Sequence, residues 1–149
     1  MTLKQAIHFH FVQVINDKIG LYKQVLADLK ESGTNETKST AGDKHETSLA
    51  MLQIEQANIR TQLNDVVAQK VVLEKINPLL SASVILNGSL VKTDKNYFYL
   101  SIALGKVVID DLVVVGISPQ SPLGQKLMGL KVGDKVNVNT HTYAVESIL

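Results

Sequence analysis

The sequence contains no cysteine among its 149 residues. Disulfide bonds and zinc sites built on thiolates are therefore excluded. This absence fits a reducing compartment, and we expect the protein to act in the cytoplasm. No apolar run reaches the roughly 18 residues that a membrane-spanning helix needs. The N-terminal residues, Met1 to His8, contain Lys4 but no apolar segment or cleavage site of a signal peptide. We expect no signal peptide and no membrane partner.

The chain also lacks an excess of charge of either sign. It carries 15 Lys and Arg residues against 14 Asp and Glu residues, which gives a net charge of +1, and it has no long basic run. Proteins that bind nucleic acid without regard to sequence need a basic face. The sequence therefore gives no support for direct binding of this kind.

Proline is missing from the first 77 residues, and all three prolines lie at Pro78, Pro119 and Pro122. Proline lacks an N–H group and clashes with the preceding helical turn, so its absence permits long helices. The remaining residues are rich in Val, Ile, Tyr and Thr, which favour strands. We predict a helical domain over residues 1–77 and a strand-rich domain over residues 78–149, with the boundary at Asn77-Pro78.

Two segments of the first domain have seam residues at alternating steps of three and four, the pattern of a coiled coil. Residues 3–32 and 46–76 are predicted to be antiparallel helices, each roughly 45 Å long at a rise of 1.5 Å per residue. Such a hairpin satisfies its own seam, so we expect a monomer. The predicted seam comprises Ile7, Phe11, Val14, Ile15, Ile19, Tyr22, Leu26 and Leu29, and then Leu49, Leu52, Gln56, Ile59, Leu63, Val66, Lys70 and Leu73.

A polar segment joins the two predicted helices, and we expect a long tip loop over about residues 33–45. Asp43 and Glu46 lie three residues apart at the start of the second helix, where such a spacing puts both on one face. Thr40 and Asp43 resemble a capping box. Acids in a first helical turn favour its positive end. A capping role and a metal-binding role are both open for the two acids, and they are compatible.

The second domain is predicted to be a small, mostly antiparallel sheet with one short helix, so the fold class is α+β. Ser121 is the predicted N-cap of this helix, Pro122 its first residue and Gly129 its C-cap. Asp110-Asp111 interrupts an apolar run and indicates either two short strands or one bulged strand. The predicted strands cover residues 83–93, with a bulge at Gly88, and residues 97–104, 107–117, 136–140 and 142–149.

A helical hairpin followed by a small strand-rich domain resembles the Gre-type transcript cleavage factors (GreA/GreB). The resemblance covers nearly the whole chain. Two motifs carry the resemblance. The first, Gly42-Asp43-Lys44-His45-Glu46, matches the Gly-Asp-x-x-Glu of the family's hairpin tip. The second covers residues 117–136 and contains Ser118-Pro119 and Gly133-Asp134-Lys135-Val136. It matches a segment of the family's FKBP-like C-terminal domain.

The resemblance implies a protein that is not itself an enzyme. Family members bind bacterial RNA polymerase, insert the coiled coil into its secondary channel, and stimulate the polymerase to cleave backtracked RNA at its 3′ end. It implies that Asp43 and Glu46 assist by sharing a Mg²⁺ ion with the polymerase, and that the chain has no cofactor of its own. Mg²⁺ is usually held by one or two carboxylates together with substrate phosphates, which suits such a shared site. The C-terminal domain would anchor the factor at the channel mouth, with partner-binding residues Ser121, Pro122, Leu123 and Gly124.

The sequence leaves other functions open. After Glu46 the chain continues Thr47-Ser48, where the family has Asn followed by an acidic residue and Tyr. A non-cleaving regulator or inhibitor in the same channel is therefore an alternative, as is a coiled-coil adaptor for another partner. His45 is a further candidate ligand or an ordinary surface residue.

Two enzymatic alternatives have less support in the C-terminal domain. Ser121 is not accompanied by the His and acid motifs of a nucleophilic serine, so a cap is the better interpretation. Prolyl isomerase activity, which the FKBP-like resemblance could suggest, needs an aromatic-lined pocket. The aromatic residues of this domain are limited to Tyr97, Phe98, Tyr99 and Tyr143.

Overall fold

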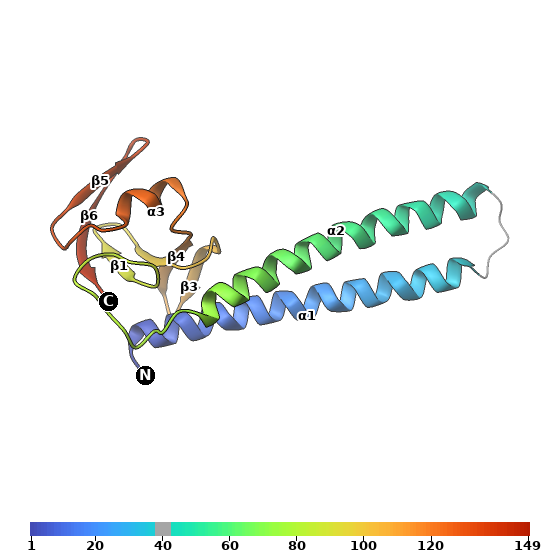
Figure 1. Cartoon of the computed structure of the whole chain (residues 1–149), viewed down its shortest axis with the longest axis horizontal. Coiled ribbons are helices and arrows are strands. Elements are labelled where there is room, and N and C mark those ends of the chain that lie inside the picture. The colour runs from blue at the N-terminus through green and yellow to red at the C-terminus, as the bar shows by residue number, and fades with distance from the viewer. Residues whose placement is uncertain (38–42) are drawn as a thin grey trace. The chain divides into compact units, whose positions relative to one another are not determined.

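The computed structural model describes the backbone of residues 1–37 and 43–149, and the side chains of residues 1–34 and 46–149. The described chain contains two long helices, six strands and one short helix, which are labelled in Figure 1. The chain divides into two compact units. One is Gln13–Lys70, and the other combines Met1–Val12 with Val71–Leu149. Both long helices contribute residues to both units, and each unit is described by itself.

The helical unit is formed by the central and distal turns of α1 (Leu3–Thr37) and α2 (Asp43–Glu74). Every predicted seam residue within it is half-buried or buried, whereas most of the other described positions are exposed. Ile15 and Val66 are its most deeply buried side chains. The amide Nε2 of Gln56 lies 4.0 Å from the position that a Cβ on Gly33 would occupy. The predicted helical hairpin and its seam are confirmed for this unit.

The two helices are longer at their facing ends than the sequence predicts. α1 continues to Thr37 rather than ending at residue 32, and α2 begins at Asp43 rather than at residue 46. The hydroxyl of Thr34 donates to the carbonyl oxygen of Lys30 at 3.1 Å, so this turn-forming residue is satisfied inside a helix. The polarity of this segment therefore led to an overestimate of the length of the connection between the two helices. Residues 38–42, which include Thr40 and Gly42, lie outside the described residues.

The other unit contains a six-stranded sheet in the order β3-β4-β2-β1-β6-β5. Its neighbouring strands are antiparallel except for β2 and β4, which run parallel. The predicted α+β class is confirmed, and the parallel pair is the feature that the sequence did not indicate. The strands are β1 (Leu90–Thr93), β2 (Tyr97–Leu100), β3 (Gly105–Ile109), β4 (Leu112–Ile117), β5 (Lys135–Val138) and β6 (His141–Ile148).

The Asp110-Asp111 pair forms a tight turn between β3 and β4. Both residues have positive φ, 48° and 66°, which is the backbone of a two-residue hairpin turn. Ile109 and Leu112 pair directly on either side of it. The apolar run is therefore two strands rather than one bulged strand.

The predicted strand over residues 83–93 is mostly wrong, because only Leu90–Thr93 is a strand. Gly88 is not a bulge but part of a turn with φ of 90°, and its N–H donates to Leu100 O at 2.6 Å. The hydroxyl of Ser89 accepts the N–H of Leu86 at 2.9 Å. A side chain that bonds to the local backbone in this way competes with strand pairing.

The sheet is covered on both faces, since successive residues of a strand point to opposite sides. Phe98 belongs to one core cluster, together with Leu127 of α3 (Pro122–Leu127). Its neighbour Tyr99 is fully buried and meets the ring of Phe11 on α1 edge-on, with ring centroids 5.1 Å apart. A Cβ on Gly116 would lie 2.7 Å from Phe11. The first turns of α1 therefore belong to the core of the sheet unit.

Candidate functional site

The first turn of α2 carries the predicted acidic pair. α2 begins at Asp43, so Asp43 and Glu46 occupy positions of one helix that are three residues apart and share a face. The side chain of Glu46 is exposed. The side chains of Asp43, Lys44 and His45 lie outside the described residues. The joint use of the two carboxylates stays a prediction, as does a ligand role for His45.

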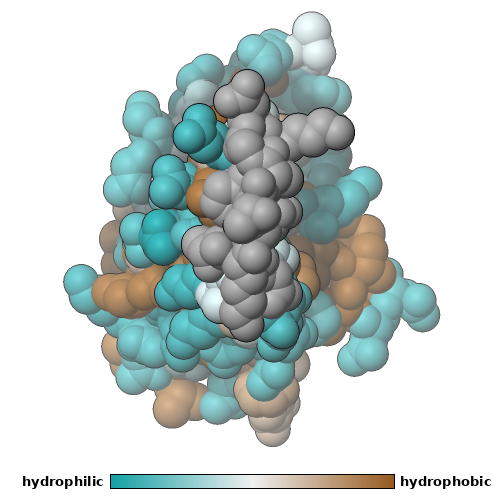
Figure 2. Space-filling view, turned by 90° about the vertical axis from the view of Figure 1, so that its right-hand side faces the viewer, coloured by the Kyte–Doolittle hydropathy of each residue, from teal (hydrophilic) through white to brown (hydrophobic). Residues whose placement is uncertain are grey.

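The chemistry of the described part of this turn suits an anionic tip. A helix N-terminus carries partial positive charge, which favours carboxylates there by about 0.3–1 kcal/mol each. Figure 2, which faces this end of the hairpin, shows mainly hydrophilic residues, with separate apolar ones among them. The side chain of Glu46 is exposed, so it can interact with solvent or with a partner.

The donor set also fits a shared Mg²⁺ ion. Carboxylate oxygens are the hard ligands that Mg²⁺ prefers, and it is commonly held by one or two of them, with waters and phosphates completing its shell. Two acids on one helical turn meet this demand only in part. The described residues contain no group of three or more His, Asp or Glu side chains placed to hold a metal ion by themselves.

The loop before α3 is organised by Ser121, as predicted. Its hydroxyl accepts the N–H of Gly124 at 3.0 Å and donates to Ser118 O at 2.7 Å. Ser121 is thus the N-cap of α3, and Pro122 is the first helical residue. The predictions for Ser121 and Pro122 are confirmed. The C-cap is Met128, one residue before the predicted Gly129, which follows it with φ of 83°.

The four predicted partner-binding residues have different surroundings. Gly124 is buried, and a Cβ there would lie 2.1 Å from Ser118 O, so only glycine fits. Leu123 is half-buried against the core cluster, whereas Pro122 is exposed. Most of this segment is thus engaged within the domain. Its role in binding a partner stays a prediction that rests mainly on Pro122.

The Gly133-Asp134 pair of the second motif is also structural. The N–H of Gly133 donates to Val145 O at 2.8 Å, and the N–H of Val145 donates to Asp134 O at 2.9 Å. The carboxylate of Asp134 accepts the N–H of Lys131 at 2.8 Å. These bonds join the turn before β5 to β6, so this motif specifies the fold of the domain rather than a reaction.

A polar cluster that the sequence did not single out lies between α1 and the sheet. The Nδ1 atom of His8 and the hydroxyl of Tyr99 are hydrogen-bonded at 2.6 Å. Burial lowers the pKa of His8, and the ammonium of Lys4 lowers it further, whereas burial raises the pKa of Tyr99. Lys4 and His8 are four residues apart and flank Ile7 on the buried side of α1. Helical spacing from Ile7 and Phe11 could have indicated this placement.

Comparison with known proteins agrees with the second motif. The family model described as "Transcription elongation factor, GreA/GreB, C-term" matches residues 114–148. Residues 114–148 are thus similar to the C-terminal domain of the GreA/GreB family. This confirms the resemblance drawn from the sequence. The matched residues run through the last strands of the sheet and include α3 with its cap.

A curated relative and a solved structure are also similar to this chain. "Transcription elongation factor GreA" from Chlorobium limicola is 37% identical over 73 residues, which cover 40% of this chain and 46% of the relative. The alignment thus spans about half the length of that relative. A structure of "the transcription factor Gfh1" is 19% identical over 92% of both chains, with a TM-score of 0.37. At this TM-score the fold rests on the elements described above.

None of the helices in the described part of the chain is long and apolar enough to span a bilayer.

Proposed function

We propose that this chain is a transcription elongation factor that binds bacterial RNA polymerase, and therefore acts in the bacterial cytoplasm. The observation that carries the proposal is the family match over residues 114–148. The relative from Chlorobium limicola, which is named a transcription elongation factor, supports it. The long paired helices support it as well, because a hairpin with a thin seam can enter a narrow channel.

The finer proposal concerns the tip. Asp43 and Glu46 would enter the secondary channel and add their carboxylate oxygens to a Mg²⁺ site that the polymerase completes. A second metal ion in such a site stabilises the attacking and leaving oxygens of phosphodiester hydrolysis. The chain's own part is to bring two acids on one helical face to the backtracked RNA 3′ end, and the polymerase performs the cleavage. Support comes from the exposed Glu46 in the first turn of α2.

The test uses a stalled, backtracked elongation complex with labelled RNA. The wild-type protein is expected to shorten the RNA from its 3′ end in the presence of Mg²⁺. The double change Asp43→Ala, Glu46→Ala should abolish the shortening, while the variant still pulls down the polymerase. Loss of cleavage together with loss of binding would instead place the two acids in the binding contact.

Glu55 and Asp65 provide a matched control, because both are exposed acids farther along α2. The double change Glu55→Ala, Asp65→Ala removes the same charge and should leave cleavage at the wild-type rate. If this control loses cleavage to the same extent, the effect comes from the net charge of the hairpin rather than from the tip.

A second function is favoured by the residues after Glu46. Thr47 and Ser48 provide no acid there, whereas the family pattern has one. The alternative is a regulator that occupies the same channel without stimulating cleavage. In that case the wild-type protein would bind the polymerase, and neither it nor the tip variant would shorten the RNA. Failure of the polymerase pull-down would exclude both channel-binding functions and favour an adaptor for another partner.

The exposed Pro122 tests the proposed contact of the α3 loop with the polymerase. It lies outside the core and is the first residue of α3, a position that tolerates other residues. Pro122→Ala should preserve the fold, as judged by circular dichroism, and reduce retention of the polymerase. Unchanged retention would remove this loop from the proposed interface.

A further inference from the structure

Asn87 is the only asparagine in the sequence that is followed by glycine. The backbone nitrogen after an asparagine can attack the carbon of the side-chain amide, and glycine hinders this attack least because it has no Cβ. Asn87 is exposed, whereas Gly88 is buried. Among the described residues, none is hydrogen-bonded to the side chain of Asn87. The amide carbon is therefore accessible, and the surroundings of the Gly88 nitrogen decide whether the pair reacts.

The pair lies at the centre of a β-turn over residues 86–89. The N–H of Ser89 donates to Leu86 O at 3.0 Å, which closes the turn. Gly88 has φ of 90°, and Asn87 is not among the residues with positive φ. Positive φ at the third position alone is the pattern of a type II turn, which calls for glycine or asparagine there. The Asn-Gly pair is thus required locally by the turn.

Hydrogen bonds keep the nitrogen of Gly88 from reacting. Its N–H donates to Leu100 O at 2.6 Å. The hydroxyl of Ser89 accepts the N–H of Leu86 at 2.9 Å, and the N–H of Leu100 donates to Ser89 O at 3.0 Å. On the inner side of the turn, a Cβ on Gly88 would lie 3.0 Å from Cγ2 of Ile76. The nitrogen can attack only after its N–H has left Leu100 O, because it must first lose its proton.

We propose that Asn87 is a site of spontaneous deamidation whose rate is set by local opening of this turn. In the open state the nitrogen of Gly88 loses its proton to hydroxide and forms a bond to Cγ of Asn87, and ammonia leaves. Water then opens the resulting imide ring at either carbonyl. The net reaction converts asparagine and water to ammonia and either aspartate or isoaspartate. In the closed state the buried nitrogen does not react.

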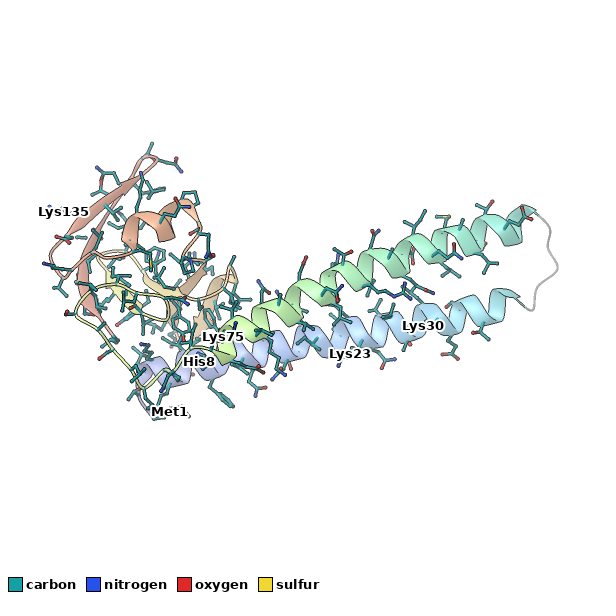
Figure 3. All side chains as sticks on the ribbon, viewed as in Figure 1. Met1, His8, Lys23, Lys30, Lys75 and Lys135 are labelled. Carbon is teal, nitrogen blue, oxygen red and sulfur yellow. The ribbon has the colours of Figure 1, made fainter. Side chains whose placement is uncertain are left out.

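The two products have different consequences for the sheet unit. Asn87 lines an open hollow of about 390 Å³ together with Lys75, which is exposed and marked in Figure 3. An aspartate has the shape of asparagine and fits the same turn, and Lys75 offers it a positive charge. Isoaspartate adds a methylene group to the main chain. Gly88 N–H and Ser89 O then cannot both reach Leu100, so this product holds the turn open.

This site is separate from the tip of the hairpin and from the α3 loop, so the inference does not depend on the proposed action on RNA polymerase. The full chain is aged at mildly alkaline pH, in buffer and in concentrated urea, and conversion is followed by peptide mass spectrometry. In urea, Asn87 should convert ahead of every other asparagine and give both products. In buffer, conversion should be at least about tenfold slower, because it requires the turn to open. Hydrogen exchange of the Gly88 amide requires the same opening and should be slowed by a similar factor.

Two serine variants give a matched comparison. Ser89→Ala removes the hydroxyl that accepts the N–H of Leu86. It should speed conversion in buffer about two- to tenfold, the range of one lost hydrogen bond, and leave the rate in urea unchanged. Ser83→Ala removes an exposed hydroxyl and should convert as wild type does in both conditions. If Ser89→Ala fails to fold, as judged by circular dichroism, the wild-type rates and the exchange of Gly88 decide.

The proposal is overturned if Asn87 converts equally fast in buffer and in urea, or if a folded Ser89→Ala variant converts no faster than wild type. Formation of aspartate alone would also overturn it, because direct hydrolysis does not involve the nitrogen of Gly88. The consequence for the fold is tested at the Leu100 amide. Asn87→Asp should keep its protection from hydrogen exchange, whereas the isoaspartate fraction of aged protein should lose it. Equal protection in both would overturn the claim that isoaspartate holds the turn open.

Discussion

The helical unit and the sheet unit keep their conformation by different means. In the helical unit, Gln13–Lys70, Ile15 and Val66 are the only buried apolar side chains among those that the structure describes, and the rest of the seam is half-buried. In the sheet unit, Tyr99, Leu90, Leu100 and Val114 are all fully buried. A pair of helices has too little surface between them to build a thick core. The stability of the hairpin therefore depends on many similar contacts repeated along the seam, whereas the stability of the sheet unit depends on a few fully buried side chains.

This difference matters for function. A repeated seam tolerates exchange of many surface residues, including Glu46 in the first turn of α2. Lys23 and Lys30, which are labelled along α1 in Figure 3, are examples of its exposed side chains. The sheet unit is less tolerant, since its motif residues are engaged in caps and turns. Substitutions in the two units should therefore differ in size and even in sign.

The largest effect is expected for Phe11→Ala in the sheet unit. Phe11 is fully buried against Tyr99 and Gly116, and removing such a ring costs about 3–5 kcal/mol of unfolding free energy. The control is Phe9→Ala, because Phe9 lies on the same helix and is 56% exposed. Urea unfolding, followed by tyrosine fluorescence, should show a loss of stability for the first variant alone. Equal losses would mean that α1 does not pack on the sheet through Phe11.

A smaller but still large loss is expected for Gly124→Ala. The new Cβ would lie 2.1 Å from Ser118 O, and this oxygen belongs to the backbone of the capped turn. Overpacking of this kind costs about 3 kcal/mol. Ser121→Ala, which removes only the cap, should cost about 1 kcal/mol. Thermal unfolding should rank the two variants in that order. The reverse order would show that the cap matters more than the close approach.

The elements that the sequence predicts well are those with local causes. Steps of three and four residues indicate the seams, and Ser121 before Pro122 indicates the start of α3, because each pattern acts within a few residues. Asp110-Asp111 marks the interruption of an apolar run, but the sequence leaves a turn and a bulge both open; the structure has a turn, whose positive φ these side chains tolerate. These local signals also carry the motif that identifies the C-terminal domain.

The features that the sequence does not predict depend on contacts between residues that are distant along the chain. The parallel pairing of β2 with β4 and the hydrogen bond of His8 with Tyr99 join segments whose own sequence does not specify a partner. Residues 83–89 are apolar enough for a strand, but Ser89 and Gly88 form a turn instead. The tip acids were indicated by spacing and resemblance, and their joint geometry stays a prediction.

The third prediction concerns acid destabilisation of the sheet unit by His8. Its pKa in the folded protein lies below the ordinary value of 6.5, because of burial and the charge of Lys4. As the pH falls below 6.5, the unfolded chain takes up a proton that the folded state resists, so the unfolding free energy decreases. One titrating group can lower the unfolding free energy by at most about 1.4 kcal/mol per pH unit. For His8 the loss should be a fraction of this value, because solvent screens the half-exposed ring.

This contribution is measured as a difference between variants, since carboxylates also affect stability at low pH. His8→Gln keeps a polar group near Tyr99 and should flatten the dependence between pH 6.5 and the folded pKa. His10→Gln is the control on the same helix, where no side-chain hydrogen bond joins the described His10 to the sheet. A wild-type pH profile in the His8 variant would rule out this linkage.

The last comparison concerns two glycines whose surroundings leave equal space for a Cβ, and one of the two substitutions is expected to stabilise. A Cβ at Gly20 of α1 or at Gly105 of β3 would meet nothing within 4 Å. Gly20 is helical, so Gly20→Ala should stabilise the hairpin by about 0.5–1 kcal/mol, because alanine loses less conformational freedom on folding. Gly105 has φ of 76°, which is costly for any residue with a Cβ, so Gly105→Ala should destabilise by about 1–2 kcal/mol. Amide hydrogen exchange of α1 and of the β3–β4 hairpin measures the two changes locally. If Gly20→Ala instead lowers the hydrogen-exchange protection of α1, a contact made by another part of the protein requires glycine at this position.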